Sequence, residues 1–443
     1  MPELGLPDTA ASLWLYALPL LLIFVIYGWR RSKQHRVSSG ILQKSVEAGL
    51  TEPSTLHPVV DHVRCLGCAI CVKACPEKDV LGIIHGKAQL VNPTHCIGHG
   101  ACKKACPFDA IELVFGTEKR GVDIPTLDPD FQTSVPGIFI AGELGGMGLI
   151  RNAVSQGCQA VEAISRLDGI GRRDDDGYDL VVVGAGPAGI AASLAAMERG
   201  LRCVTLEQDS LGGTVAHYPR GKIVMTAPAK LPLVGTMQFR ETTKETLLAF
   251  WQDIEARTGL KVNYNERVNK VESLAEGFVV KTTASAYRCR AVLLAIGRRG
   301  TPRTLGVPGE EQAKVVYRLL DPQQYRNQHV LVVGGGDSAL EAATSIADET
   351  GTTVTLSYRS EAFARAKEKN RARVEQARNE GRLEVMMKSS VKSIGRDTVT
   401  IDHDGAQKTL PNDVVIVCAG GILPTPFLKE IGIEVQTRYG TAA

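Results

Sequence analysis

The sequence lacks a surplus of charge of either sign. Its 443 residues include 51 Lys and Arg against 48 Asp and Glu, which gives a formal net charge of +3. Electrostatic binding of nucleic acid usually needs a marked basic surplus, so we expect no nucleic-acid partner. Domains usually contain ~100–200 residues, so the length predicts about three of them.

Cysteine is scarce outside one short region. The chain has 11 cysteines, too few for a disulfide scaffold at this length, and most of them lie between residues 65 and 106. Such crowding is typical of metal ligation in a reducing compartment. The remaining cysteines lie far apart, and we interpret them as core residues rather than as a redox-active dithiol. They are Cys158, Cys203, Cys289 and Cys418.

The amino terminus lacks the features of a removable signal peptide. Glu3 and Asp8 stand where a signal peptide has Lys or Arg, and no small-residue cleavage site follows. Residues 11–28 carry no charge, and the basic run WRRSKQHR comes directly after them. This pattern predicts a transmembrane anchor over residues 1–30, with the redox domains on the cytoplasmic side of the inner membrane. A buried helix and a helix lying on the lipid surface are the alternatives.

The first cysteine run indicates iron–sulfur clusters. It reads Cys65-x2-Cys68-x2-Cys71-x3-Cys75-Pro76, the spacing of bacterial ferredoxins in which the fourth cysteine ligates the other cluster. A structural zinc site would instead show paired Cys-x2-Cys units. Two halves of about thirty residues repeat within residues 58–116, so we expect two clusters there.

The second run departs from this pattern at one position. It reads Cys96-x2-His99-x2-Cys102-x3-Cys106-Pro107, with histidine where the second cysteine should stand. The region resembles two-cluster ferredoxins, which implies two 4Fe-4S clusters with the following ligands. Cys65, Cys68, Cys71 and Cys106 would hold one cluster, and Cys75, Cys96 and Cys102 the other, with His99 as its candidate fourth ligand. Imidazole in place of thiolate should raise the reduction potential of that cluster. In the alternatives, His99 points away from a 3Fe-4S cluster, or an outside ligand completes the site.

Two glycine turns indicate two dinucleotide sites. Gly184, Gly186 and Gly189 form G-x-G-x-x-G after a β-rich run, and Glu207 follows about twenty residues later, where it can bind a ribose. A second copy has Gly334, Gly336 and Ala339 in these positions.

The strand of the second copy ends in cations rather than in an acid. Arg359 follows it at once, and Arg365 comes shortly after. Cations there suit a 2′-phosphate, which favours NADPH over NADH. A solvated basic helix is the alternative for the segment from Arg365 onward. Asp337 and Ser338, which open the helix after the glycines, complete the predicted NADPH site.

The two units together resemble the thioredoxin reductase-like flavoproteins. The stretch VTLSYRSEAFARAKEKNR is similar to the bacillithiol disulfide reductases of that superfamily. The resemblance implies FAD in the first unit and NADPH in the second. It adds to the FAD site Pro187, Ala188, Gln208, Gly213, Thr214, Ala295 and Gly297. The disulfide-active Cys-x-x-Cys of thioredoxin reductases is absent, and so is the carboxy-terminal segment that normally closes the FAD domain.

That closing segment has a counterpart earlier in the chain. TSVPGIFIAGELGGMGLIRNAVSQGCQAVEAI, residues 133–164, resembles it. The resemblance puts Glu143, after Gly142, in the position of the family's Asp, and has Arg151, Asn152 and Ala153 open the helix beside the flavin ring, so all five belong to the expected FAD site. We infer a circular permutation, because a nucleotide-binding sheet without its last lobe would leave the flavin uncovered. A vestigial duplicate, or completion in trans by a second subunit, are the alternatives.

The expected fold class is α/β: two Rossmann-like domains, for FAD and NADPH, with an α+β two-cluster ferredoxin domain and one N-terminal transmembrane helix. In chain order we expect an anchor (1–30), a tether (31–57), the ferredoxin-like domain (58–116), the displaced lobe of the FAD domain (117–168), the FAD-binding domain (178–320), the NAD(P)H-binding domain (321–426) and a return to the FAD domain (427–443).

The expected function is electron transfer between NADPH, FAD, two clusters and a redox partner. Hydride transfer to a flavin depends on stacking and orientation, so we assign no catalytic residue beyond the cofactors. The partner is an unknown redox protein or a quinone, and we expect a membrane-anchored homodimer. Reduction of a low-molecular-weight disulfide, a non-enzymatic redox sensor and flow from a reduced ferredoxin to NADP⁺ are the alternatives.

Overall fold

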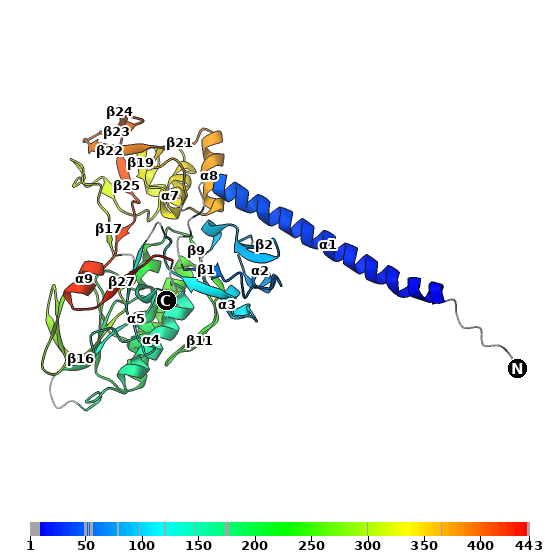
Figure 1. Cartoon of the computed structure of the whole chain (residues 1–443). Coiled ribbons are helices and arrows are strands. Elements are labelled where there is room, and N and C mark those ends of the chain that lie inside the picture. The colour runs from blue at the N-terminus through cyan, green and yellow to red at the C-terminus, as the bar shows by residue number, and fades with distance from the viewer. Residues whose placement is uncertain are drawn as a thin grey trace. The chain divides into compact units, whose positions relative to one another are not determined.

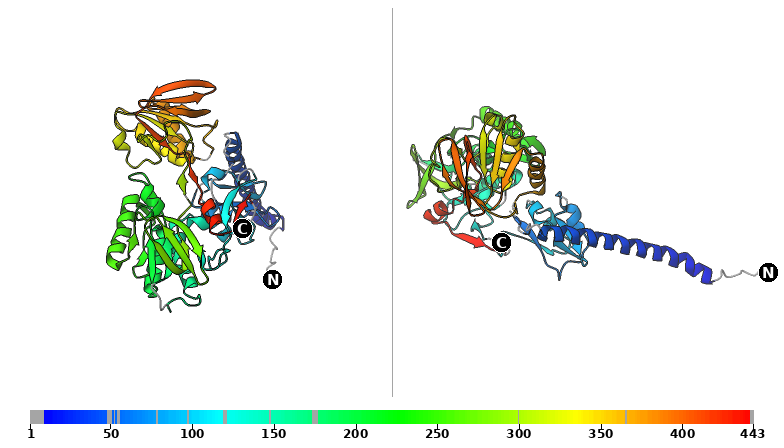
Figure 2. Two further views of the ribbon diagram at one scale, coloured as in Figure 1. Left: turned by 90° about the vertical axis from the view of Figure 1, so that its left-hand side faces the viewer. Right: turned by 90° about the horizontal axis from the view of Figure 1, so that it is seen from above.

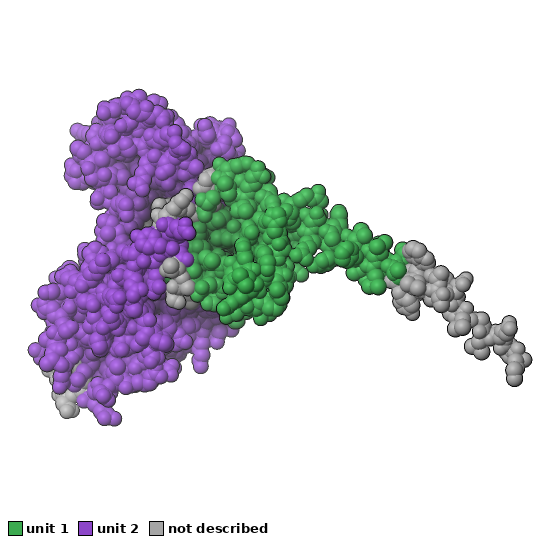
Figure 3. All heavy atoms as spheres, viewed as in Figure 1, with its two compact units in different colours: residues 1–115, 441–443 green, residues 116–440 purple. Residues whose placement is uncertain are grey.

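A computed structural model gives the fold of the chain as two compact units, residues 1–115 with 441–443 and residues 116–440, coloured separately in Figure 3. The structure describes residues 9–47, 51, 53, 56–77, 79–96, 98–118, 121–146, 148–172, 177–298, 300–364 and 366–440, with the backbone alone for residues 9–16 and 225.

The first unit begins with one long helix, α1 (Thr9–Glu47), drawn in blue in Figure 1. Its second half packs on strand β2 (Leu81–Ile84), where Ser38 is buried against Gly82. A Cβ on Gly82 would lie only 2.5 Å from Ser38 Oγ. Residues 31–47, for which we predicted a tether, therefore form a helix that packs on the cysteine-bearing domain.

The predicted membrane anchor is wrong. Among the residues whose side chains the structure describes, no helix offers an apolar stretch long enough to cross a membrane. The described side chains of α1 before Arg30 cover residues 17–29 alone, and a span needs ~20 apolar residues. Residues 1–8 of the predicted anchor lie outside the described residues. Placing the redox domains on the cytoplasmic side of a membrane is wrong with it.

The rest of the first unit is a small α+β fold with two similar halves. Strand β1 (His57–Val60) pairs antiparallel with β4 (Ile111–Val114), and β2 forms a hairpin with β3 (Lys87–Leu90). The short helices are α2 (Ile70–Ala74), α3 (Ala101–Ala105) and the 3-10 turn η1 (Pro93–His95). Its core contains the cysteines themselves, so side chains that would ligate clusters also pack the domain.

The second unit contains a first Rossmann sheet in the order β13-β8-β7-β16-β15-β14. Parallel strands β7, β8 and β13 lie on one side of β16, with helix α5 following β7. The bounds are β7 (Tyr178–Val183), α5 (Pro187–Glu198), β8 (Cys203–Leu206), α6 (Lys244–Thr258), β13 (Val262–Asn263), β14 (Val268–Ser273), β15 (Phe278–Thr282) and β16 (Ala286–Leu294). Between β8 and α6 lie η3 (Gly213–His217), β9 (Ile223–Met225), β10 (Ala229–Leu231), β11 (Gly235–Met237) and β12 (Glu241–Thr243).

An earlier segment of the chain completes this sheet. Strand β6 (Ile138–Ile140) pairs parallel with β16 on the side away from β7, and helix α4 (Ile150–Ile164) lies beside α5 (Figure 1). The two helices approach so closely that a Cβ on Gly157 would lie 2.2 Å from the Ala188 carbonyl oxygen. The 3-10 turn η2 (Glu143–Gly145) connects β6 to α4.

The carboxy-terminal segment pairs with the start of this lobe. Strand β27 (Val435–Arg438) runs antiparallel to β5 (Val122–Pro125), after helix α9 (Thr425–Glu430). The Asp123 carboxylate accepts hydrogen bonds from Thr437 Oγ1 at 2.7 Å and from Thr425 Oγ1 at 3.2 Å. Two strands that lie far apart in the sequence are thus paired antiparallel.

A second Rossmann sheet, in the order β18-β25-β19-β20-β21, forms the rest of the unit. Figure 2 shows it in yellow and orange from two further sides. Its elements are β18 (Val315–Val316), η4 (Pro322–Tyr325), β19 (His329–Val333), α7 (Asp337–Ala347), β20 (Thr353–Ser357), α8 (Glu368–Asn379), β21 (Leu383–Met386) and β25 (Val414–Val417). A meander of β22 (Ser389–Ile394), β23 (Thr398–His403) and β24 (Ala406–Pro411) flanks it, and β17 (Thr301–Pro302) pairs with β26 (Gly421–Ile422).

Candidate cluster and dinucleotide sites

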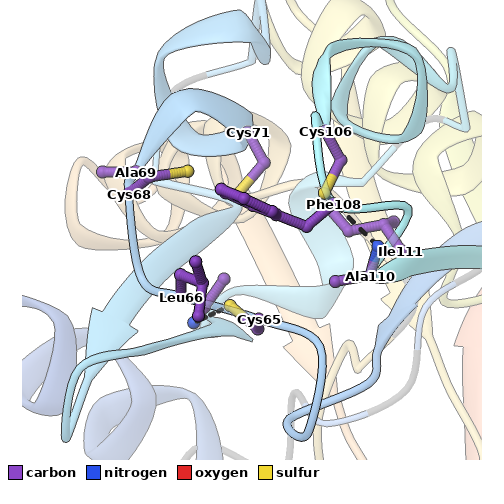
Figure 4. A pocket seen from close by; sticks show the side chains of 10 residues that line it. Cys65, Leu66, Cys68, Ala69, Cys71, Cys106, Phe108, Ala110 and Ile111 are labelled. Carbon is purple, nitrogen blue, oxygen red and sulfur yellow. Dashed lines mark hydrogen bonds between the residues drawn. The ribbon is translucent and has the colours of Figure 1, made fainter.

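Four cysteines of the first unit surround one cavity. Cys65, Cys68, Cys71 and Cys106 line it together with Leu66, Phe108 and Ala110 (Figure 4). These are the four ligands expected for the first cluster: Cys65 and Cys68 come from one loop, Cys71 from α2, which follows it, and Cys106 from the end of α3. Among the described residues, no three His, Cys, Asp or Glu side chains converge tightly enough for one metal ion. Thiolates spread around a cavity suit a cluster of several irons.

Backbone amides support two of these sulfurs. The Ala88 N–H donates to Cys65 Sγ and the Ala110 N–H to Cys106 Sγ, both at 3.4 Å. Hydrogen bonds to cluster sulfurs are one of the factors that set a cluster's reduction potential. Cys68 differs from the others because it is exposed, whereas Cys65 and Cys71 are buried.

The other three cysteines form a second group. Burial is the main cause of the raised pKa of Cys96 and of Cys102; the nearby Cys102 and Cys75 raise the pKa of Cys96 further, and Cys75 raises that of Cys102 further. This is the grouping expected for the second cluster. Cys71 also has Cys102 as a neighbour, so the two groups adjoin.

Burial makes these thiols hard to ionise. It raises the pKa of Cys71 and of Cys96 to about 11, and it also raises the pKa of Cys75 and Cys102. Cluster iron binds thiolates, so ligation must displace protons that the folded domain otherwise retains. The residues fit an iron–sulfur cluster better than a reactive free thiol, which would have a lowered pKa.

His99 lies at the second group and faces a residue that the sequence analysis missed. Its Nε2 is 4.0 Å from Glu77 Oε1, and Glu77 is also an electrostatic neighbour of Cys75 and Cys96. Burial lowers the pKa of His99, which favours the neutral imidazole that can ligate a metal. The repeat could have revealed Glu77, because it follows Cys75-Pro76 as Phe108 follows Cys106-Pro107.

Two glycines of the first turn, Gly184 and Gly189, have no space for a side chain. A Cβ on Gly189 would lie 1.8 Å from the Gly184 carbonyl oxygen, and one on Gly184 would lie 2.6 Å from the Ala295 carbonyl oxygen. Pro187 and Ala188 then begin α5, which places the turn at a helix N-terminus, where phosphates bind.

The acid that follows this turn is buried beside it. Glu207 Oε2 accepts a 2.7 Å hydrogen bond from the Ala185 N–H, and Oε1 accepts one from the Asp209 N–H at 2.9 Å. Burial nevertheless raises the pKa of Glu207. The adjacent Gln208 is exposed. A carboxylate held at the end of the second strand fits the ribose contact of a dinucleotide.

Residues of the displaced lobe reach this turn. A Cβ on Gly142 would lie 3.1 Å from the Cβ of Ala188 and 3.7 Å from that of Ala153, while the Gly142 N–H donates to Gln156 Oε1 at 2.8 Å. Arg151 and Asn152 stand in the first turn of α4, and Glu143 is exposed in η2. The lobe therefore supplies predicted flavin residues to the same corner as α5.

Two more predicted flavin residues meet on the other side of the turn. A Cβ on Gly297, which has φ +64°, would lie 3.8 Å from Thr214 Oγ1. Gly213 lies against Gly186, with its Cβ position 3.1 Å from the Gly186 Cα. The absence of side chains here leaves backbone exposed to a ligand, as a bound pyrophosphate requires.

The second glycine turn has the same form in the second sheet. A Cβ on Gly334 would lie 2.4 Å from the Cys418 carbonyl oxygen, whereas one on Gly336 would meet nothing within 4 Å. The Asp337 carboxylate accepts hydrogen bonds from the Lys367 N–H and from Asn370 Nδ2. Ser338 is exposed on the first turn of α7.

The cations expected at this turn are only partly described. Arg359 is exposed two residues after β20 ends at Ser357, while Arg365 lies outside the described residues. The ring of Tyr358 covers Gly335, whose Cβ position lies 2.3 Å from it. This edge of the sheet can hold a nucleotide whose ribose end meets a cation.

The fold and sites together define a flavin- and nicotinamide-dependent oxidoreductase with an iron–sulfur domain. Residues 181–441 match the family model described as pyridine nucleotide-disulphide oxidoreductase, and residues 57–107 match the model described as a 4Fe-4S dicluster domain. The chain belongs to the pyridine nucleotide-disulphide oxidoreductases, fused to a two-cluster ferredoxin domain. It is an FAD-dependent NAD(P)H oxidoreductase.

Named relatives resemble the reductase part. The chain is 34% identical over 271 residues to a ferredoxin–NADP reductase of Picrophilus torridus, covering 58% of this chain and 78% of that protein. It is 29% identical over 262 residues to the corresponding reductase of Ignicoccus hospitalis, covering 58% and 82%. The solved bacillithiol disulfide reductase Bdr of Staphylococcus aureus superposes with a TM-score of 0.53 at 25% identity, covering 60% of this chain and 86% of that one.

Proposed function

We propose that the protein passes electrons between NADPH, FAD, two iron–sulfur clusters and a redox partner protein. The observation that carries this proposal is the convergence of Cys65, Cys68, Cys71 and Cys106 on one cavity, in a chain that also contains two glycine turns. The similarity to proteins named ferredoxin–NADP reductases also supports electron transfer between a nicotinamide nucleotide and an iron–sulfur protein.

The chain's own residues would bind and orient the cofactors and would not donate protons. Bound FAD would accept a hydride, two electrons with one hydrogen nucleus, and release the electrons one at a time to clusters that each accept one. The turn at Gly184 and Gly189 and the helix N-terminus after it would hold the diphosphate. Gly142 and Ala153 of the displaced lobe would close the site around the flavin.

NADPH is the proposed nucleotide, with NADH as the alternative. Arg359 is exposed just beyond β20. In the first Rossmann unit, the corresponding strand, β8, is followed by the acid Glu207 instead. A cation at this position pairs with a 2′-phosphate, whereas an acid repels it.

His99 is the proposed fourth ligand of the second cluster. Its neighbours Gly98 and Gly100 have φ angles of +80° and +71°, and Gly67 and Ala69, which flank Cys68, have φ angles of +67° and +60°. Because the two loops share these left-handed turns, His99 occupies the position in the second repeat that Cys68 occupies in the first. A 3Fe-4S cluster and an outside ligand remain the alternatives.

The first cluster is the proposed contact with the partner protein. Cys68 is exposed. Two apolar side chains that line the same cavity are exposed as well, Leu66 over 63% and Phe108 over 41% of its surface, and nearby in sequence Val63 is 90% exposed. A small apolar patch of this kind suits the weak, transient interfaces of electron-transfer proteins.

A circular permutation is the proposed origin of the lobe at residues 117–168. Its strand β6 pairs with β16, its helix α4 lies beside α5, and β27 pairs with β5. These contacts are made within one chain, which supports completion in cis. A homodimer remains a prediction of the sequence.

Reduction of a low-molecular-weight disulfide is a second candidate, which the likeness to bacillithiol disulfide reductase favours. The candidate thiols for such a reaction would be Cys158, Cys203, Cys289 and Cys418, the cysteines outside the cluster domain. If replacing each of them by serine leaves disulfide-reductase activity intact, a mechanism that uses one of these thiols is excluded.

Anaerobic titration of the purified protein with NADPH tests the electron path. We expect flavin absorbance to fall first and paramagnetic signals of reduced clusters to follow, recorded by optical and electron paramagnetic resonance spectra. Dithionite serves as the control that the clusters can be reduced at all. A flavin that bleaches while dithionite-reducible clusters stay oxidised would contradict the proposed path.

A further inference from the structure

One segment of the second unit connects the two glycine turns. Residues 213–222 start at Gly213, which lies against Gly186 of the first turn, and end at Lys222 just before β9. From Lys222 the contacts pass to the second Rossmann domain. The segment thus reaches from the flavin side to the nicotinamide side of the reductase.

Lys222 makes the central contact of this connection. Its Nζ donates to both carboxylate oxygens of Glu341 on α7, each at 2.5 Å, and the two side chains are only 35% and 20% exposed. A partly buried ion pair with two short contacts fixes geometry better than a typical exposed pair does.

The contact continues to the second glycine turn. Buried Asn370 donates from Nδ2 to Glu341 Oε1 at 3.1 Å and to Asp337 Oδ1 at 2.7 Å. Asp337 is the first residue of α7 and directly follows Gly336. Lys222, Glu341, Asn370 and Asp337 therefore form one polar chain between the domains.

Two further contacts flank this chain and are more exposed. Arg220 pairs with Asp321 at 3.2 Å, with 67% and 37% of their side chains exposed. Arg318 lies 3.4 Å from Asp209 Oδ2 and also contacts His217. They join the same two domains, but neither touches the glycine turn at Gly336, so Lys222 is the contact best placed to orient it.

We propose that Lys222 is a positioning residue for hydride transfer, acting through Glu341 on the orientation of the nicotinamide-nucleotide domain over the flavin domain. The bound cofactors would supply a hydride transfer in which the nucleotide is oxidised and the flavin is reduced by two electrons. Lys222 would act through Glu341 and not on the reacting atoms. A small displacement of one reactant lowers the rate without requiring any loss of binding.

Rapid-mixing measurements of flavin reduction by NADPH in the full-length protein test this role. Misplacements of ~1 Å can cost about a hundredfold in rate, so we expect Lys222→Met to slow flavin bleaching by about tenfold or more. The NADPH concentration that gives half the maximal rate should stay near the unaltered value, because the glycine turn and Arg359 are intact. Lys222→Arg should restore most of the rate.

The partner residue and a matched ion pair provide the controls. Glu341→Gln should slow bleaching as much as Lys222→Met, and the double variant should be no slower than either one, because both changes remove the same contact. Arg326→Met breaks a 2.8 Å pair with Glu349 that lies within the nicotinamide-nucleotide domain, and it should leave the rate unchanged.

Several results would overturn the proposal. They are unaltered or faster bleaching in Lys222→Met, an additive double variant, or an equal loss in Arg326→Met. Flavin content and melting temperature are measured for each variant, and Glu341→Gln, which lies in the other domain, keeps the test decisive if Lys222→Met loses FAD. Because only flavin bleaching is read, the outcome is independent of the proposed cluster path.

Discussion

The two cluster sites differ at the residue that follows each Cys-Pro pair. Phe108 lines the first cavity, whereas the equivalent Glu77 adjoins the second group and faces His99. An aromatic ring makes the lining of the first site more apolar, while a carboxylate and an imidazole make the second site polar. Environment and ligand identity both set cluster potentials, so the two clusters should not be equivalent.

Replacing His99 by cysteine tests this difference. We expect the reduction potential of the second cluster to fall, because a thiolate adds negative charge next to the iron and disfavours an additional electron. The potential of the first cluster should not change. Redox titrations followed by electron paramagnetic resonance measure both values.

His62→Cys is the matched control, since His62 is an exposed histidine of the same domain. It should leave both potentials unchanged. If His99→Cys also changes neither, His99 is not in the coordination sphere of the cluster.

At the residue scale, the sequence predicts the sites that local motifs mark better than it predicts contacts between distant residues. The spacing within each cysteine run and each glycine turn depends on neighbours within a few residues, whereas the grouping of cysteines across the two runs came from the resemblance to two-cluster ferredoxins. Glu77 and Lys222 were missed because their partners, His99 and Glu341, lie 22 and 119 positions away. A single charged residue has no local pattern that reveals such a partner.

At the scale of elements, helix α1 shows how composition can mislead. The apolar residues 11–28 suggested a membrane span, and the mixed residues 31–57 suggested a tether. The structure instead continues one helix to Glu47 and buries Ser38 and Ser45. Two small polar residues on the packed face hide the periodicity that would have identified a docked helix.

Gly82→Ala tests whether α1 supports the cluster domain. The new methyl group would meet Ser38 Oγ at 2.5 Å and Val91 Cγ1 at 2.9 Å. We expect a loss of about 1–3 kcal/mol in stability, typical of overpacking, and a lower melting temperature for the iron-loaded protein.

A second change separates this clash from a general effect of alanine. Ser38→Gly added to Gly82→Ala should recover part of the stability, because it removes the nearest atoms. Gly40→Ala on the same helix has nothing within 4 Å of its new Cβ and should not destabilise the protein. Equal losses in both alanine variants would argue against a packed α1.

At the scale of the whole molecule, the order of segments can be changed. The Cβ position of Gly440 lies 3.5 Å from the Cα of Thr117, so residues 440 and 117 are neighbours in space. A reductase module in which residues 117–172 follow residue 440 should therefore fold and bind FAD as the native chain does. Flavin absorbance per protein measures the outcome.

The matching control is the module of residues 178–440 without the lobe. It should lose FAD, because Gly142, Ala153 and helix α4 are missing from the site. If it keeps FAD at the native level, the lobe is a duplicate and the proposed permutation is wrong.

The exposed ligand Cys68 has a consequence for the chemical lifetime of the protein. Oxidants such as dioxygen reach thiolates according to their exposure, and Cys68 is exposed while Cys65 and Cys71 are buried. In air, damage would begin at the first cluster, leaving a protein that still oxidises NADPH with its flavin but has lost its connection to a partner. The same exposure that would let electrons pass to the proposed partner would thus limit how long the assembled protein survives oxygen.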